Sequence, residues 1–157
     1  MTARQISTTL TSPDETCALA AQMGAFLHPG DVILLSGGIG AGKTHFARCL
    51  IQSVLLEPED IPSPTFTLVQ VYDTRAGELW HSDLYRLSGP DDCVELGLTE
   101  AFETAICIVE WPDKLEDLTP ANALHLILSD GDQEDVRILT AQWSDPRWTA
   151  MLERLIA

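Results

Sequence analysis

One glycine-rich segment, residues 37–44, constrains this chain more than any other feature. It reads Gly-Gly-Ile-Gly-Ala-Gly-Lys-Thr and fits the pattern G-x-x-x-x-G-K-[S/T] at every fixed position. Glycines let the backbone curl so that successive N–H groups converge on phosphate oxygens, and a following helix adds the positive end of its dipole. The lysine then reaches the β- and γ-phosphates, and the hydroxyl ligates Mg²⁺. The pattern predicts a nucleoside triphosphate site formed by Gly37, Gly38, Ile39, Gly40, Ala41, Gly42, Lys43 and Thr44.

The segments around this loop indicate the architecture in which it lies. An aliphatic run before it is typical of a strand buried on both faces, and helical spacing of apolar residues follows it. We expect an α/β, P-loop NTPase-like three-layer fold, in which antiparallel hairpin strands extend a central parallel sheet, within a single domain over residues 1–157. The first hairpin is expected to turn over five residues, 73–77. Expected strands cover residues 6–10, 31–35, 66–72, 78–84, 105–109, 124–128 and 136–141, and expected helices cover 13–28, 44–55, 91–96, 99–104 and 145–155.

Charge is the unusual feature of the composition. Twenty-four Asp and Glu residues oppose nine Lys and Arg residues, which gives a formal net charge of −15 and a sequence pI near 4.3. Nucleic acid repels such a field, because affinity for a polynucleotide comes largely from cations that displace phosphate counterions. Direct binding of tRNA or a duplex is therefore disfavoured. The chain has only two lysines, Lys43 and Lys114, so a lysine inside the loop stands out.

Neither a membrane-spanning segment nor a secretory signal is indicated. The chain has no apolar run near the roughly 18 residues that a spanning helix needs, and no apolar stretch follows the single cation of the N-terminus. We expect a cytoplasmic protein. The spacing of the four cysteines fits neither a metal site nor a redox pair, so all four are expected as reduced thiols. They are Cys17, Cys49, Cys93 and Cys107.

Two acidic residues end expected strands and are candidates for the parts that a P-loop enzyme needs beyond its loop. Glu110 closes the run Ile-Cys-Ile-Val-Glu, a Walker-B-like pattern, and Asp83 closes Leu-Trp-His-Ser-Asp. An acid in this place lies near Mg²⁺ and the attacking oxygen. Thr65 follows the loop helix, where P-loop switches place a threonine that senses the γ-phosphate. His81 fits a packed or hydrogen-bonding side chain better than a catalytic base.

Four motifs occur in one order along the chain. They are Gly-Ala-Gly-Lys-Thr at 40–44, Ser-Pro-Thr-Phe-Thr-Leu-Val at 63–69, His-Ser-Asp-Leu-Tyr-Arg-Leu at 81–87 and Val-Glu-Trp-Pro at 109–112. Their order and spacing resemble the TsaE family, the small bacterial P-loop ATPases of threonylcarbamoyladenosine tRNA biosynthesis. The resemblance extends over residues 12–137. The Walker loop alone fits many families, whereas the four motifs together are specific.

This resemblance implies an ATPase subunit that uses ATP and Mg²⁺ and acts with two partner proteins, TsaB and TsaD. That assembly places a threonylcarbamoyl group on the adenosine beside the tRNA anticodon, with TsaD performing the transfer. The TsaE-like subunit hydrolyses ATP, poorly by itself, and lets the assembly turn over. It would meet tRNA only through its partners, which agrees with the charge of −15.

The resemblance also implies residue roles, position by position. Gly38 and His45 depart from the family, which commonly has Asp and a second Thr there, and Gly38 indicates a more mobile loop entry. Trp111 is expected to hold its loop or the nucleotide. The implied catalytic residues are Lys43, Thr65, Asp83 and Glu110, the implied metal ligands are Thr44, Asp83 and Glu110, and the further nucleotide contacts are Trp111, Thr11, Glu15 and Arg137.

Two other functions stay open at this point. A small-molecule kinase needs a second substrate pocket and usually an arginine-bearing lid, and the arginines that follow the loop helix do not cluster in the sequence. A nucleotide-sensing interaction module would bind ATP without cleaving it. Guanine recognition through Asn-Lys-x-Asp is excluded, because Ala123 follows the only asparagine, Asn122.

Overall fold

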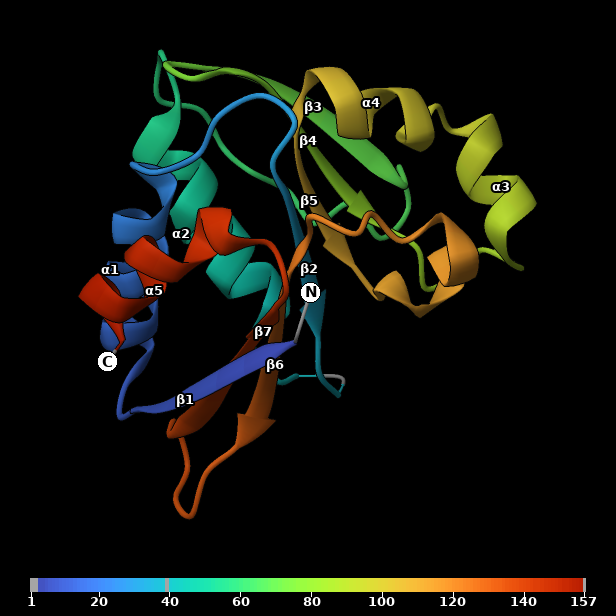
Figure 1. Cartoon of the computed structure of the whole chain (residues 1–157). Helices are drawn as coiled ribbons and strands as arrows, with labels where there is room; N and C mark the ends of the chain where they lie inside the picture. The colour runs from blue at the N-terminus through green and yellow to red at the C-terminus, as the bar shows by residue number, and fades with distance from the viewer. Residues whose placement is uncertain (1–2, 39, 157) are drawn as a thin grey trace.

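A seven-stranded mixed sheet forms the centre of the protein (Figure 1). The computed structural model describes residues 3–38 and 40–156. The strands are β1 (Arg4–Leu10), β2 (Val32–Ser36), β3 (Val69–Thr74), β4 (Gly77–Asp83), β5 (Ile106–Glu110), β6 (Leu124–Asp130) and β7 (Arg137–Trp143). Their order in the sheet is β1-β7-β6-β2-β5-β4-β3. The four central strands are parallel, and antiparallel strands extend the sheet at both edges, which confirms the expected fold class.

Helices cover both faces of this sheet (Figure 1). One face carries α1 (Pro13–Gly24), α2 (Lys43–Val54), the 3-10 turn η2 (Pro146–Trp148) and α5 (Thr149–Leu155). The other face carries α3 (Pro90–Glu95), α4 (Leu98–Thr104) and the 3-10 turn η1 (Pro112–Leu118). The molecule therefore has the three layers that the alternation of strands and helices predicts.

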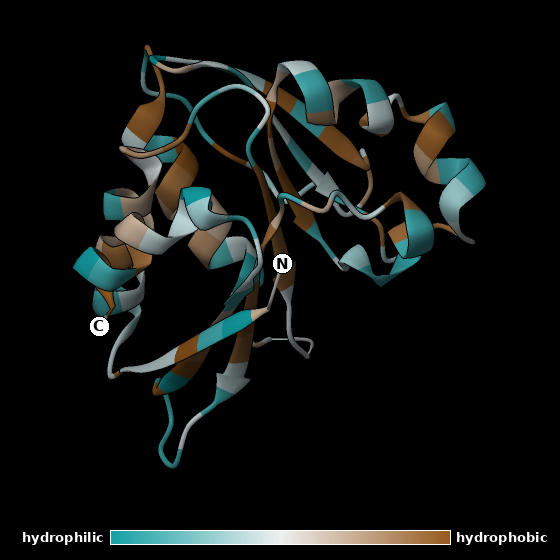
Figure 2. Cartoon of the chain, viewed as in Figure 1, coloured by the Kyte–Doolittle hydropathy of each residue, from teal (hydrophilic) through white to brown (hydrophobic). Residues whose placement is uncertain are grey.

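Each face of the sheet has its own apolar core. Ile33 and Leu35 of β2 pack toward α1 and α2, whereas Val32 and Leu34 pack toward α4 and η1. Successive side chains of a strand point to opposite faces, so a strand between two helical layers must be apolar throughout. The two innermost strands, β2 and β5, are accordingly apolar along almost their whole length (Figure 2).

The parallel strands bring three chain segments together at one edge of the sheet. In the register of β2 with β5, Leu35 lies opposite Glu110, and in the register of β4 with β5, Asp83 lies opposite Glu110. The carboxyl ends of β2, β4 and β5 therefore meet where the glycine-rich loop leaves β2. This edge is where open parallel sheets bind their ligands.

Several expected boundaries are wrong. The strand expected from residue 66 begins at Val69, because residues 64–67 form a turn in which Leu68 N donates to Pro64 O at 2.7 Å. The first hairpin turns over two residues and not five, because Thr74 pairs with Gly77 and its hydroxyl both donates to Gly77 O and accepts from Ala76 N. Helix α1 ends at Gly24 and not at residue 28. A Cβ at Gly24 would lie 2.6 Å from Ser53 Oγ, so α1 and α2 are in close contact where α1 ends.

The expectation of four reduced cysteines is also wrong. Cys17 of α1 and Cys49 of α2 form a disulfide across the packed helices, with a Cα–Cα distance of 5.1 Å. The sequence conceals this pair because 32 residues separate its members, and only the packing of the helices brings them together. Cys93 and Cys107 are free and buried, and burial raises the pKa of Cys107 to about 12. Among the described residues, no helix is long and apolar enough to cross a membrane.

Candidate nucleotide site

The glycine-rich loop joins β2 to α2, as predicted. Gly37 has a φ of 147°, and a Cβ there would lie 2.4 Å from the carbonyl oxygen of Leu128, so only glycine fits. Gly42, with a φ of 100°, is the N-cap of α2 and has no side chain to accept from the first N–H groups of that helix. Those groups face the loop and form a place for an anion. Ile39, also predicted to bind nucleotide, lies outside the described residues.

Lys43 is buried beneath this loop, at 5% exposure. Its Nζ donates to the carbonyl oxygens of Gly37 and Gly38, both at 2.9 Å, and lies 4.1 Å from the centre of the Trp111 ring. Burial lowers the pKa of Lys43, although the charges of Glu110 and Asp83 act in the opposite direction. The ammonium is therefore desolvated beside the loop, where a phosphate oxygen is a stronger acceptor than a carbonyl.

Glu110 accepts a hydrogen bond at each carboxylate oxygen. Thr44 Oγ1 donates to Oε1 at 2.7 Å, and His81 Nε2 lies 2.7 Å from Oε2. Glu110 and His81 are buried, at 2% and 0% exposure. The carboxylate is thus fixed between the first turn of α2 and strand β4, and it touches the hydroxyl that a P-loop uses for Mg²⁺.

Asp83 joins the segment after α2 to the same edge. Its Oδ2 accepts a long hydrogen bond of 3.4 Å from Thr65 Oγ1, and its Oδ1 accepts from Tyr85 N at 2.9 Å. The Thr65 hydroxyl is also 2.8 Å from Ser63 Oγ. Thr65, the switch-like threonine, therefore lies beside Asp83 at the end of β4. The spacing of the two residues in the sequence does not by itself predict this contact.

A cleft of about 420 Å³ opens over this constellation. Its volume is typical of sites for small molecules. Most of the predicted site residues line it, together with His45 and Tyr85, which the sequence reasoning did not place there. Tyr85 follows an acid of the His-Ser-Asp-Leu-Tyr motif by two positions, and its ring packs on Trp111 at 4.8 Å between centroids. The lining residues are Gly40, Gly42, Lys43, Thr44, His45, Thr65, Asp83, Tyr85, Glu110 and Trp111.

Six described residues that were predicted to contact the nucleotide do not line the cleft: Gly37, Gly38 and Ala41 of the loop, and Thr11, Glu15 and Arg137 outside it. Glu15 Oε1 accepts from the backbone N–H of Thr11 at 2.8 Å, a contact that steadies the start of α1. Arg137 of β7 donates to the carbonyl oxygens of Ala41 at 3.2 Å and Gly40 at 3.4 Å. In this structure Arg137 supports the loop, and its predicted contact with a nucleotide stays a prediction.

The donor set fits a magnesium ion. Thr44, Asp83 and Glu110 offer hard oxygen ligands at one edge of the cleft, as Mg²⁺ prefers. In the part of the chain that the structure describes, no three His, Cys, Asp or Glu side chains gather as a metal cage.

The loop, its buried lysine and the strand-end acids define a P-loop NTPase-like domain. The sequence model described as "Threonylcarbamoyl adenosine biosynthesis protein TsaE" matches residues 10–138, so the chain belongs to the TsaE family. A Rickettsia bellii protein named tRNA threonylcarbamoyladenosine biosynthesis protein TsaE is 40% identical over 128 residues, which cover 80% of this chain and 89% of that protein. The Bacillus subtilis protein of the same name is 35% identical over 140 residues, 88% of this chain and 87% of its own length.

A solved structure agrees with this assignment. The crystal structure of YdiB from Bacillus subtilis superposes with a TM-score of 0.77 at 30% sequence identity, covering 99% of this chain and 96% of that one. The resemblance drawn from the four sequence motifs is thereby confirmed.

Proposed function

We propose that this protein binds and hydrolyses Mg-ATP in support of threonylcarbamoylation of the tRNA adenosine next to the anticodon, acting with TsaB and TsaD in the cytoplasm. The observation that carries the proposal is the contact between Thr44 and Glu110 beside the buried Lys43. A loop that only recognised phosphate would not need a buried carboxylate from β5 against the hydroxyl of the first turn of α2. Membership of the TsaE family supports the pathway.

The reaction follows from the positions of the side chains. The triphosphate would lie on the N–H groups of the loop and of the first turn of α2, with Lys43 exchanging its carbonyl partners for phosphate oxygens. Glu110 and Asp83 line the same cleft, where they can orient a water for in-line attack on the γ-phosphate. Bound Mg²⁺ would neutralise charge on the phosphate oxygens and be held by Thr44 and the two acids.

The charge of the chain supports a division of labour with the partners. A net charge of −15 opposes direct contact with tRNA, so we propose that TsaB and TsaD hold the tRNA. An electrophoretic shift assay with tRNA and this protein alone should show no complex at physiological salt. A shift by the isolated chain would contradict this part of the proposal.

Phosphate release from ATP tests the proposed reaction. It should be slow for the protein alone and faster when TsaB and TsaD are added. Lys43→Met should abolish the stimulated rate, whereas Lys114→Met changes the only other lysine, which also donates to backbone carbonyls, and should leave the rate near that of the wild type.

Three results would contradict the proposal and point elsewhere. A phosphorylated acceptor in place of free phosphate would indicate a small-molecule kinase. Calorimetric binding of ATP with no phosphate release, even with both partners present, would indicate a nucleotide-sensing module. No heat of binding at millimolar ATP would remove the nucleotide site itself.

A further inference from the structure

His81 is a fully buried side chain that the proposed reaction leaves without a role. It lies on β4, two residues before Asp83, and neither touches the loop nor lines the cleft. Its Nε2 atom is 2.7 Å from Glu110 Oε2. A polar ring at 0% exposure requires a reason, because a residue that only fills space is usually apolar.

The surroundings of the ring determine where its proton lies. Nδ1 of His81 is buried and has no hydrogen-bond partner among the described residues. A proton on Nδ1 would leave a buried N–H unsatisfied, which is costly, whereas an unprotonated Nδ1 leaves only a lone pair. The hydrogen-bond geometry therefore places a proton on Nε2, and His81 donates to the carboxylate of Glu110, which can only accept.

This donor determines how the Glu110 carboxylate is oriented. His81 and Asp83 share one face of β4, and Asp83 lies directly opposite Glu110, so His81 lies one step behind the two acids. With Oε2 held from behind by His81, Oε1 is the oxygen that faces Thr44. Rotation of the carboxylate would break both hydrogen bonds at once.

We propose that His81 is a positioning residue that presents Oε1 of Glu110 to the metal side of the cleft. This inference rests on the proposed function, because it supposes that Glu110 acts on Mg-ATP. His81 itself touches neither nucleotide nor water. Partners that orient a metal-side ligand from behind are typically worth about 10–100-fold in metal affinity or activity.

The test compares His81→Leu with His81→Gln in the full-length protein with TsaB and TsaD. Leucine fills the site but offers no donor, whereas glutamine carries an N–H at a similar reach. We expect His81→Leu to lower kcat for phosphate release about 10–100-fold with little change in KM for Mg-ATP, and His81→Gln to recover most of that loss. The matched control is His125→Leu, a half-buried histidine of β6 that bonds Ser36 Oγ, and it should leave kcat near the wild-type value.

A binding measurement separates positioning from mere packing. Calorimetry with a non-hydrolysable ATP analogue should give the same affinity without Mg²⁺ for wild type and His81→Leu, and an apparent Mg²⁺ affinity about tenfold weaker for the variant. In a Glu110→Gln background, His81→Leu should cause no further loss, because its effect passes through Glu110.

Several results would overturn the assignment. Wild-type kcat in His81→Leu, equal losses in the Leu and Gln variants, or an additive loss in the Glu110→Gln background would each do so. If His81→Leu does not fold, His81→Asn, whose amide is too short to reach Glu110, replaces it beside His81→Gln. Failure of the wild type to release phosphate would refute the proposed function, and the Mg²⁺-linked binding would still decide the role of His81.

Discussion

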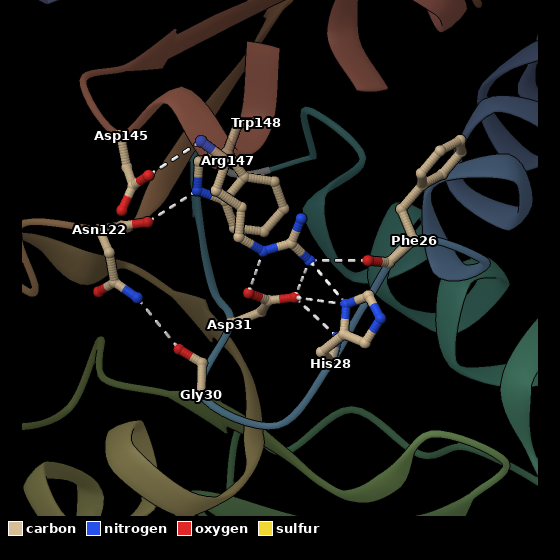
Figure 3. Close-up of polar contacts among 8 residues, drawn as sticks. All are labelled: Phe26, His28, Gly30, Asp31, Asn122, Asp145, Arg147 and Trp148. Carbon is tan, nitrogen blue, oxygen red and sulfur yellow. Dashed lines mark hydrogen bonds and ion pairs between the residues drawn. The ribbon is translucent and has the colours of Figure 1, made fainter. Parts of the chain in front are cut away.

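Two clusters of buried charge lie at opposite ends of strand β2, and they differ in how completely their charges are matched. The cleft cluster, at the carboxyl end, consists of Lys43, His81, Asp83 and Glu110. The Asp31 cluster precedes the strand and consists of Asp31, Arg147 and the groups that contact them (Figure 3). Both contain a buried carboxylate and a cation, and the cleft cluster includes residues that line the cleft of about 420 Å³.

In the Asp31 cluster, both oxygens of the carboxylate are paired. Arg147 donates from Nε to Oδ1 of Asp31 at 2.5 Å and from Nη2 to Oδ2, and Nη2 also donates to the carbonyl oxygen of Phe26 at 2.7 Å. The backbone N–H of His28 donates to Oδ2 at 2.7 Å. Both oxygens of the carboxylate thus accept, and the guanidinium stacks on the ring of Trp148 at 4.4 Å (Figure 3).

Two further hydrogen bonds connect this cluster to the segments before β2 and β6. The indole of Trp148 donates to Asn122 O at 2.7 Å, and the amide of Asn122 donates to Gly30 O at 3.2 Å. The turn η2, which leads into α5, is therefore bonded to the segments that precede β2 and β6 (Figure 3).

The cleft cluster is built differently. Its lysine is bonded to backbone carbonyls and not to a carboxylate, and Asp83 and Glu110 lie opposite each other on adjacent strands. Like charges in this position repel, and burial penalises them further. The difference indicates that one end of β2 serves stability, whereas the other end keeps unmatched charge for phosphate and metal at some cost to stability.

The largest expected effect comes from Glu110→Gln in the cleft cluster. The amide keeps the shape but cannot act as a carboxylate, so partner-stimulated phosphate release should fall about 10²–10³-fold. The free energy of unfolding in urea should stay the same or rise, because a buried charge at 2% exposure is removed. A clear fall in that free energy would make this end of β2 structural as well and break the comparison.

Asp31→Asn should give the opposite result. The substitution removes the buried negative charge that pairs with the Arg147 guanidinium. The free energy of unfolding should therefore fall by about 3 kcal/mol, while the affinity for ATP stays unchanged. The control is Asp130→Asn, which removes the exposed partner of Arg137 at 3.8 Å and should cost less than about 1 kcal/mol. Equal losses in the two variants would show that the buried pair has no special weight.

A double-mutant cycle sharpens this result. Asp31→Asn and Arg147→Met should be non-additive, with a coupling free energy of about 1–3 kcal/mol measured by urea unfolding. The double variant should therefore be more stable than the sum of the single losses predicts. It should still fall short of the wild type, since Phe26 O loses its donor and His28 N keeps a weaker acceptor. Strict additivity would mean that the two side chains act independently.

The sequence predicted the cleft cluster far better than the Asp31 cluster. The glycine pattern specifies a loop and its lysine, and acids that end apolar runs meet there because parallel strands share an edge. The Asp31–Arg147 pair spans 116 residues and has no local pattern, and the disulfide between Cys17 and Cys49 depends on how two helices pack. His81 was visible as a hydrogen-bonding residue, but its partner on the neighbouring strand depends on the register of β4 with β5.

The smallest expected effect concerns His125, whose Nε2 lies 2.6 Å from Ser36 Oγ at the cleft end of β2. Burial lowers the pKa of His125 from its ordinary 6.5. Above that pH the ring is neutral in both states. As the pH falls below 6.5, His125 takes up a proton in the unfolded chain but not yet in the folded protein. The free energy of unfolding therefore falls with pH until the pH reaches the lowered pKa of the folded protein.

The difference in free energy of unfolding between wild type and His125→Gln isolates this contribution, because titrating carboxylates are common to both proteins. Going from pH 7.5 to 5.5, the wild type should lose more stability than the variant, by at most about 1.4 kcal/mol per pH unit for one proton. A larger loss in the variant would reverse the sign of the effect. It would mean that the folded protein holds His125 in its charged form at the cleft end of β2. The charges at that end would then be better matched than the comparison of the two clusters supposes.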